Sequence, residues 1–333
     1  MIGRALFSAV LTLLAFAAVA GQEPVDYARD VYLKPQTLAV LPDGRHLNFF
    51  CEGEGAPVVL VAPGWHIPDI GWRVLQGEMA KVTKVCVIDR AGYGFSDPGP
   101  MPRDTAAEVK DLHDGLKAAH LAGPFVLVGH SLGGFDARLF AYKFPSETAG
   151  LLLLDPPTER IYQRTRAPDE DVGLMQRCAV LARTQTLMPH GKDGCIETAL
   201  GPGWSDAMHA RYAADEGRAA WFETLRSEDL SMVGRSSDEM VAARRSLGDI
   251  PLILLQADED CGPSGDRGDH VRCAELLSQA RDSGRGQRRI VAGASHMIQQ
   301  DKPDVFLAAF REVVSDARAS GLATADKPRK RRP

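Results

Sequence analysis

A serine set between glycines is the feature that most constrains this chain. Residues 125–134 read Phe-Val-Leu-Val-Gly-His-Ser-Leu-Gly-Gly, so an apolar run ends at Gly129 and a helical pattern begins at Gly133. Such a pattern predicts a buried strand, a sharp turn and a helix, with Ser131 at the apex. The turn pushes the serine hydroxyl outward, and the glycines remove side chains that would clash across it. The stretch therefore predicts a nucleophilic serine, provided that the chain also supplies a base and an acid.

The first twenty residues have the pattern of a secretory signal peptide. Arg4 precedes an apolar stretch that ends in Ala18-Val19-Ala20, a small-x-small sequence typical of a signal-peptidase cut. The apolar stretch is shorter than the roughly 20 residues that a membrane-spanning helix needs. We expect a mature chain that begins near Gly21, is secreted or periplasmic and has no stable membrane insertion. An uncleaved N-terminal anchor is the alternative.

Charge and residue spacing argue against several classes of partner. The formal net charge of the whole chain is −5, and removal of Arg4 with the signal peptide makes it −6 (−5 − 1), which disfavours nucleic acid. The basic end of the chain is expected to be a solvated, disordered tail. No Cys-x-x-Cys motif or histidine-rich cluster suggests a metal, and the expected chemistry requires no cofactor.

Apolar runs and helical patterns alternate along most of the chain. Strands are expected over residues 37–41, 46–51, 57–62, 84–89, 124–129, 149–154, 251–256 and 288–291. Helices are expected over residues 71–82, 105–121, 133–144, 269–282 and 303–315. A hairpin followed by repeated strand–helix units predicts an α/β fold with a mostly parallel, eight-stranded sheet and helices on both faces.

Residues 157–249 interrupt this alternation. They contain no strong strand pattern but have helical windows at residues 206–214 and 219–225. The segment is too long for a connector, so we expect a helical insertion over the carboxyl ends of the strands, where such sheets bind ligands. The expected organisation is a signal peptide (1–20), a first core segment (21–156), the insertion (157–249), a second core segment (250–318) and a basic tail (319–333).

A serine nucleophile needs a histidine base and a carboxylate that orients it, and in this type of sheet they follow in the order serine, acid, histidine. His296 is the only histidine between the last expected strand and the last expected helix. Three candidates for the acid follow the strand over residues 251–256, namely Asp258, Glu259 and Asp260. Asp155, at the end of the preceding strand, is a further candidate.

Acyl transfer also needs backbone donors for the oxyanion. The N–H of Leu132, directly after the nucleophile, is one candidate. The second is the N–H of Trp65 in the loop after the strand over residues 57–62, where Gly64 allows a close backbone approach. His66 and His130 lie near the expected pocket, where they either contact substrate or pack behind the reacting groups.

Four segments together resemble α/β-hydrolase-fold serine hydrolases of the esterase and lipase type. Gly129–Gly134 resembles the nucleophile elbow, Asp89–Asp97 an Asp-x-x-Gly-x-Gly-x-Ser loop, residues 256–260 a His-Gly-x-x-Asp pattern and residues 293–296 a Gly-x-x-His pattern. The resemblance implies Asp260 as the acid and His296 as the base. The chain departs from the family at Pro63-Gly64, where a His-Gly pair is usual.

Six cysteines, an even number in an exported chain, favour disulfides. The strand order of the family places the second strand beside the fourth, which implies a bond between Cys51 and Cys86. A second bond, between Cys261 and Cys273, would link the expected acid loop to the following helix. A third, between Cys178 and Cys195, would cross-link the insertion.

These features predict an exported serine hydrolase that cleaves a carboxylic ester of a small-molecule acyl substrate. A serine at the elbow disfavours dehalogenase and epoxide-hydrolase chemistry, for which family members use a carboxylate there. One alternative is a serine aminopeptidase of the prolyl aminopeptidase type, in which Asp169, Glu170 and Asp171 would bind a substrate amine; a solvated charge run is the simpler interpretation. The other is a non-catalytic binding protein on the same fold.

Overall fold

The computed structural model describes residues 30–159, 170–188, 192–196, 204–258 and 270–321. The expected signal peptide, Asp260, Cys261 and residues 322–333 of the expected tail lie outside this part of the chain. Within it, no helix is both long and apolar enough to cross a membrane.

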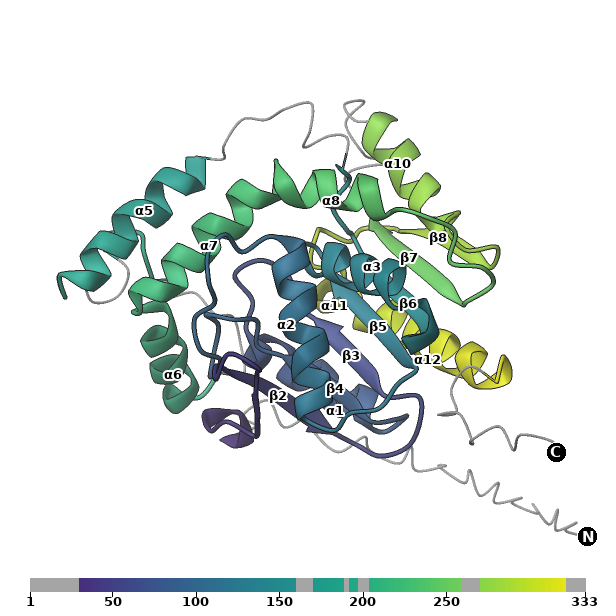
Figure 1. Cartoon of the computed structure of the whole chain (residues 1–333), viewed down its shortest axis with the longest axis horizontal. Coiled ribbons are helices and arrows are strands. Elements are labelled where there is room, and N and C mark those ends of the chain that lie inside the picture. Colours follow the sequence, from purple (N-terminus) through teal and green to yellow (C-terminus); the bar gives the residue numbers. More distant parts are fainter. Residues whose placement is uncertain (1–29, 160–169, 189–191, 197–203, 259–269, 322–333) are drawn as a thin grey trace, which may run out of the picture.

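An eight-stranded sheet forms the centre of the molecule, in the order β1-β2-β4-β3-β5-β6-β7-β8 (Figure 1). β2 pairs antiparallel with β1 and with β4, and the remaining pairs are parallel. The predicted fold class is confirmed. The strands are β1 (Thr37–Val40), β2 (His46–Glu52), β3 (Val59–Ala62), β4 (Val85–Ile88), β5 (Phe125–His130), β6 (Thr148–Leu154), β7 (Leu252–Ala257) and β8 (Gly286–Val291).

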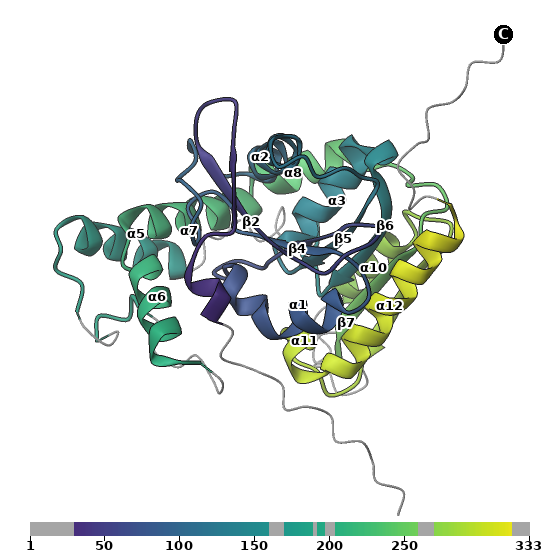
Figure 2. The ribbon, with the colours of Figure 1, turned by 90° about the horizontal axis from the view of Figure 1, so that it is seen from below.

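Helices cover both faces of the sheet (Figure 2). Every residue of β3, β5, β6 and β7 is buried, as expected for parallel strands covered on both sides. On one face pack α2 (Thr105–Ala118), α3 (Gly133–Lys143) and α10 (His270–Ala280), and on the other α1 (Arg73–Ala80), α11 (Ile298–Asp301) and α12 (Pro303–Ala319). Short 3₁₀ helices span Asp30–Leu33, Asp69–Trp72 and Pro145–Glu147.

In the part of the chain that the structure describes, four helices lie between β6 and β7, and we call them the cap. They are α5 (Glu170–Arg183), α6 (Asp206–Glu216), α7 (Ala219–Met232) and α8 (Arg235–Ala243). The described residues of 157–249 contain no strand, in line with the expected helical insertion. The cap has a small apolar cluster of its own, in which Trp221, Phe222 and Leu225 of α7 are fully buried. Met240 of α8 instead packs with α2 and α3 in the core of the sheet domain.

Disulfides link strands and cap segments as predicted. Cys51 and Cys86 are register partners on β2 and β4 and are bonded. Cys178 of α5 is bonded to Cys195. Cys273 of α10 is also in a disulfide, and its predicted partner, Cys261, lies outside the described residues.

Candidate active site

Ser131 occupies a strained turn directly after β5. Its φ is 48°, a left-handed conformation that is costly for a residue with a side chain and that clusters at functional sites. Its N–H donates to the carbonyl of Leu154 at the end of β6 (2.9 Å). Two glycines permit the turn, because a Cβ on Gly129 would collide with the carbonyl of Gly133, and one on Gly133 with that of Ala62. The backbone thus presents Ser131 at the carboxyl edge of the sheet, as the sequence predicted.

Asp155 occupies the equivalent place on the neighbouring strand. It follows β6, has a φ of 41°, and its side chain is 1% exposed. Asp155 Oδ2 lies 2.6 Å from Nδ1 of His296, and Oδ1 lies 2.9 Å from the Arg272 guanidinium. Burial by itself would raise the pKa of Asp155, but the hydrogen bond with His296 and the charge of Arg272 outweigh it and hold this pKa below its ordinary value. A buried, charged carboxylate therefore binds the predicted base.

The carboxylate that contacts His296 is Asp155, whereas the family resemblance implied Asp260. Asp260 lies outside the described residues. A histidine has one Nδ1, and that atom of His296 is bonded to Asp155. Asp258, another candidate, accepts a hydrogen bond from the N–H of Gly293 (3.4 Å) in the loop that carries His296.

His130 is buried and contacts the backbone of the base, His296. It is 1% exposed, and its Nε2 lies 3.1 Å from the carbonyl oxygen of His296. Because a carbonyl only accepts, Nε2 carries the proton of a neutral imidazole. Burial, with a smaller contribution from His296, lowers the pKa of His130 to about 3. His130 is therefore an uncharged donor that fixes the backbone of the base, which agrees with a packing role and not with direct substrate contact.

The loop after β3, Pro63–His66, lies against the serine. A Cβ on Gly64 would lie 2.7 Å from Nδ1 of His130 and 3.2 Å from the Cβ of Ser131, so only glycine fits. In the described part of the chain, neither the N–H of Trp65 nor that of Leu132 donates to a protein acceptor. Two backbone donors beside Ser131 are therefore available to a ligand.

His66 joins this loop to the cap. Its Nε2 lies 2.9 Å from the buried Glu216 of α6, its N–H donates to the hydroxyl of Tyr93 (3.2 Å), and its carbonyl accepts from the hydroxyl of Tyr212 (3.3 Å). The Trp65 indole N–H likewise donates to the carbonyl of Leu225 on α7 (3.0 Å). These contacts favour a structural role for His66.

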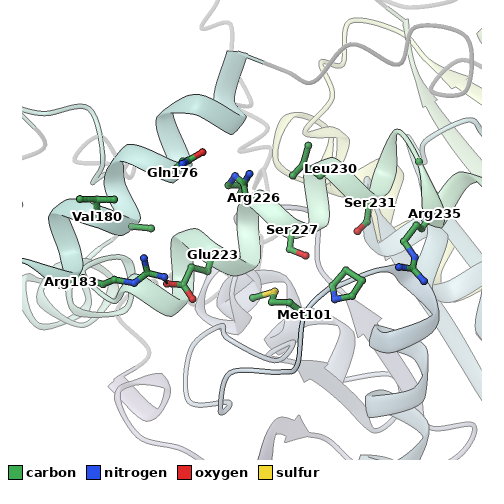
Figure 3. A pocket seen from close by; sticks show the side chains of 13 residues that line it. Met101, Gln176, Val180, Arg183, Glu223, Arg226, Ser227, Leu230, Ser231 and Arg235 are labelled. Atoms are coloured by element: carbon green, nitrogen blue, oxygen red, sulfur yellow. Dashed lines mark hydrogen bonds and ion pairs between the residues drawn. The ribbon is translucent and has the colours of Figure 1, made fainter.

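A separate cavity of about 680 Å³ lies within the cap (Figure 3). Residues of α5, α7 and α8 line it together with Met101 and Pro102, and Arg183 and Glu223 form an ion pair at one end. Its lining includes neither Ser131 nor His296.

Sequence reasoning missed Arg272, Arg90 and Glu228. Arg90 lies inside the Asp89–Asp97 motif, which was the one available signal, whereas Arg272 and Glu228 belong to helices whose partners only the fold reveals. Among the described residues, no group of three or more His, Cys, Asp or Glu side chains is placed to hold a metal ion.

The chain belongs to the alpha/beta hydrolase family, whose sequence model matches residues 58–309. It is similar to YqjL of Bacillus subtilis, with 29% identity over 263 residues that cover 79% of this chain and 85% of YqjL. For two other relatives that it matches, the chain spans only 38% and 31% of their length.

Two solved structures illustrate the shared fold. A thermophilic esterase from Thermogutta terrifontis has 22% identity, with a TM-score of 0.58 over 87% of this chain and 100% of that one. A putative epoxide hydrolase from Pseudomonas aeruginosa has 18% identity, with a TM-score of 0.64 over 86% and 97%. These two neighbours show the shared fold, and membership of the family supports a hydrolase.

Proposed function

We propose that this protein is an exported serine hydrolase that cleaves a carboxylic ester, or a related acyl bond, through an acyl-enzyme. The observation that carries the proposal is the contact of 2.6 Å between His296 Nδ1 and the buried Asp155, at the strand end next to the strained Ser131. A buried carboxylate on Nδ1 directs the other ring nitrogen, Nε2, to act as the base. In this proposal the nucleophile is Ser131, the base is His296 and the acid is Asp155.

The reaction would proceed in two acyl transfers. His296 Nε2 takes the proton from Ser131 Oγ as Oγ attacks the acyl carbonyl, and the N–H groups of Leu132 and Trp65 bind the oxyanion. Collapse of the tetrahedral intermediate expels the alcohol, which receives the proton from His296. A water molecule then attacks the acyl-enzyme by the same relay and releases the acid and the free serine.

We propose Asp155 as the acid in place of Asp260. Asp155 is buried, holds the Nδ1 position of His296 and carries its charge at neutral pH, since its pKa is lowered. The Arg272 guanidinium lies 2.9 Å from the second carboxylate oxygen and helps to hold the carboxylate in place.

Ester cleavage is preferred to two other chemistries of related proteins. The elbow carries Ser131 and not the carboxylate expected of a dehalogenase or an epoxide hydrolase. The prolyl aminopeptidase alternative relied on Asp169, Glu170 and Asp171, whose side chains lie outside the described part of the structure.

We further propose that residues 1–20 direct export, because the disulfides suit an oxidising compartment. The division into core (21–156, 250–318) and cap (157–249) is part of the same proposal.

A substrate panel tests the reaction class. Wild-type protein is assayed with p-nitrophenyl esters of increasing acyl length, with proline p-nitroanilide and with an epoxide. We expect turnover of at least one ester that is lost in Ser131→Ala without a change in the circular dichroism spectrum. Turnover of the proline amide alone would favour the aminopeptidase, and ester turnover retained by Ser131→Ala would contradict the proposal.

A further inference from the structure

The loop Pro63–His66 is bound by a chain of contacts that ends on one carboxylate of the cap. Arg90 donates from Nη1 to the carbonyl of Pro63 (2.5 Å) and from Nη2 to that of Gly64 (3.1 Å). At the far end of the loop, the N–H of His66 donates to the hydroxyl of Tyr93. Both Arg90 and Tyr93 bind Glu228 of α7, with Arg90 Nε on Oε1 (2.9 Å) and the Tyr93 hydroxyl on Oε2 (2.5 Å).

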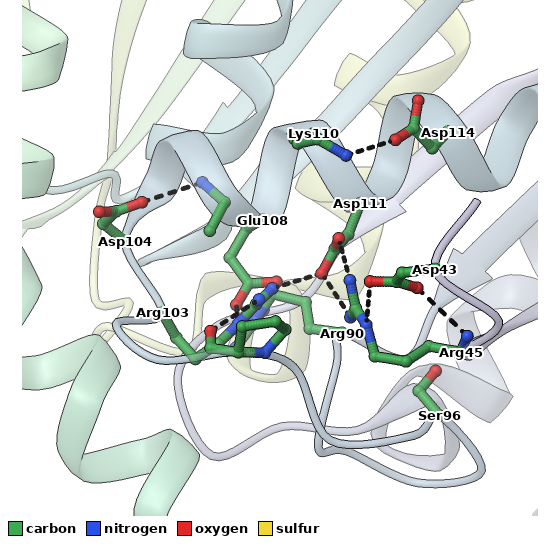
Figure 4. A network of polar contacts seen from close by, with 12 residues as sticks. Asp43, Arg45, Arg90, Ser96, Arg103, Asp104, Glu108, Lys110, Asp111 and Asp114 are labelled. Atoms are coloured by element: carbon green, nitrogen blue, oxygen red, sulfur yellow. Dashed lines mark hydrogen bonds and ion pairs between the residues drawn. The ribbon is translucent and has the colours of Figure 1, made fainter. Parts of the chain in front are cut away.

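Arg90 is paired with a carboxylate of the cap, whereas two core carboxylates near it, Glu108 and Asp111, are paired with Arg103. Figure 4 shows Arg103 bonded to Glu108 and Asp111, and Asp111 bonded also to Arg45. Arg90 is 5% exposed and the side chain of Glu228 1% exposed, so the pair is desolvated. Loss of one member of such a pair leaves a buried charge without compensation, which strongly disfavours the native arrangement.

The hydrogen bonds from Arg90 to the carbonyls of Pro63 and Gly64 fix the direction of the Trp65 N–H. The peptide between Gly64 and Trp65 is trans, so its C=O and N–H point in opposite directions. Since the Gly64 carbonyl is held on Arg90, the N–H of Trp65 points away from Arg90. Gly64 itself lies against Ser131, so this donor belongs to the peptide next to the nucleophile.

We infer that Arg90 and Glu228 are positioning residues for the oxyanion loop, so that docking of α7 on the core sets the direction of the Trp65 donor. This inference rests on the proposed function, because an oxyanion forms only in acyl transfer. It predicts that the pair acts on the transition state and leaves ground-state binding nearly unchanged, since the donor meets charge that develops during the reaction.

A purely structural role would give a different pattern, and the chain offers a matched control. Glu159 is 2% exposed, like Glu228, and is bonded to Arg138, another fully buried arginine. Arg138 lies on α3 and also contacts Tyr142, and the structure records no contact of this pair with the described loop Pro63–His66. Glu228→Gln and Glu159→Gln therefore both replace a buried glutamate that is bonded to a buried arginine.

The experiment compares three readouts in wild type, Glu228→Gln and Glu159→Gln. They are kcat and KM for a p-nitrophenyl ester, the inhibition constant of a trifluoromethyl ketone that forms a tetrahedral adduct with the serine, and hydrogen exchange of the peptide containing residues 63–66. For Glu228→Gln we expect kcat to fall about 10- to 100-fold, KM to change less than about 3-fold, and the inhibitor to weaken by the same factor as kcat. Exchange of the loop should rise. Glu159→Gln should lower the Tm but leave all three readouts near wild type.

Unchanged kcat, inhibition and loop exchange in folded Glu228→Gln would overturn the inference, as would an equal loss in Glu159→Gln. If Glu228→Gln does not fold, Tyr93→Phe removes only the hydroxyl between His66 and Glu228, and it should show the same changes to a smaller degree. A wild-type protein without ester turnover would refute the proposed function instead. The hydrogen exchange of the loop would then still decide whether Glu228 positions it.

Discussion

The strand ends and the cap are held in place by different kinds of constraint. Ser131 and Asp155 lie at the ends of neighbouring strands, and each is fixed by its own backbone, with a left-handed conformation after a buried strand. The cap is attached through side-chain contacts between residues far apart in the sequence, such as Arg90 with Glu228, Arg211 with Asp69, and the packing of Met240 in the core. Changes at the strand ends should therefore abolish chemistry, whereas changes in the cap should alter its stability and the fine placement of donors.

The largest expected effect separates the two candidate acids. Asp155→Asn leaves a side chain of the same size but removes the charge that stabilises the imidazolium of His296, so kcat for a p-nitrophenyl ester should fall roughly 10³- to 10⁴-fold. Asp260→Asn should leave kcat within about 3-fold of wild type. A large loss of kcat in Asp260→Asn with little change in Asp155→Asn would identify Asp260 as the acid and would exclude Asp155 from that role.

A second change tests whether the cap is stabilised independently. The disulfide between Cys178 and Cys195 closes a loop with a sequence separation of 17, for which loop-closure entropy gives about 3 kcal/mol. In a variant with both cysteines replaced by alanine, the amide hydrogens of α5 should exchange faster by the factor that corresponds to about 3 kcal/mol. The amides of β5 and β6 should stay protected. Equal loss of protection in the sheet would show that cap and core unfold as one unit and would contradict the comparison.

A third expectation concerns pH and the buried His130. Its folded-state pKa is lowered to about 3, against 6.5 for an ordinary histidine, so the unfolded chain binds a proton at a pH where the folded protein does not. Stability is therefore present above pH 6.5 and is lost as the pH falls toward 3, with about 2 kcal/mol lost between pH 7 and pH 5.

Urea unfolding at the two pH values measures this loss. His130→Gln keeps a donor for the His296 carbonyl and cannot titrate, so its loss should be smaller than that of wild type by about the same 2 kcal/mol. An identical pH dependence in both proteins would rule out a buried neutral His130.

The smallest expected effect is at Asp136 on α3, which lies near Arg90. Burial raises the pKa of Asp136 well above its ordinary range, more than Arg90 lowers it, so the fold favours the uncharged carboxyl. Asp136→Asn keeps the shape of that uncharged carboxyl and should be at least as stable as wild type at pH 7 by urea unfolding. A loss of several kcal/mol would mean that a charged Asp136 takes part in holding Arg90.

The sheet could be predicted because its signals are local. Continuous apolar runs marked β3, β5, β6 and β7, and all eight strands form within a few residues of the expected limits. The turn at Ser131 was equally readable, since glycines two residues to either side leave few other conformations. The position of His296 followed from its place between the last strand and the last helix.

What could not be predicted depends on partners brought together by folding. Several carboxylates follow adjacent strands, and only the packing of the loop that carries His296 decides which one reaches Nδ1. The resemblance pointed to Asp260, whereas Asp155 had the local signal of ending a buried strand. In the cap, α5 was missed because the acidic residues at its start suggested a solvated run, although acidic residues also suit the first turn of a helix.

The central claim is that Ser131 is the nucleophile of an acyl-transfer site served by His296. A fluorophosphonate probe, with mass-spectrometric mapping of the modified peptide, tests it most directly. The account predicts one adduct, on Ser131, that is absent from Ser131→Ala and forms much more slowly in folded His296→Ala. An adduct on another residue, or no adduct on a folded wild-type protein, would contradict it.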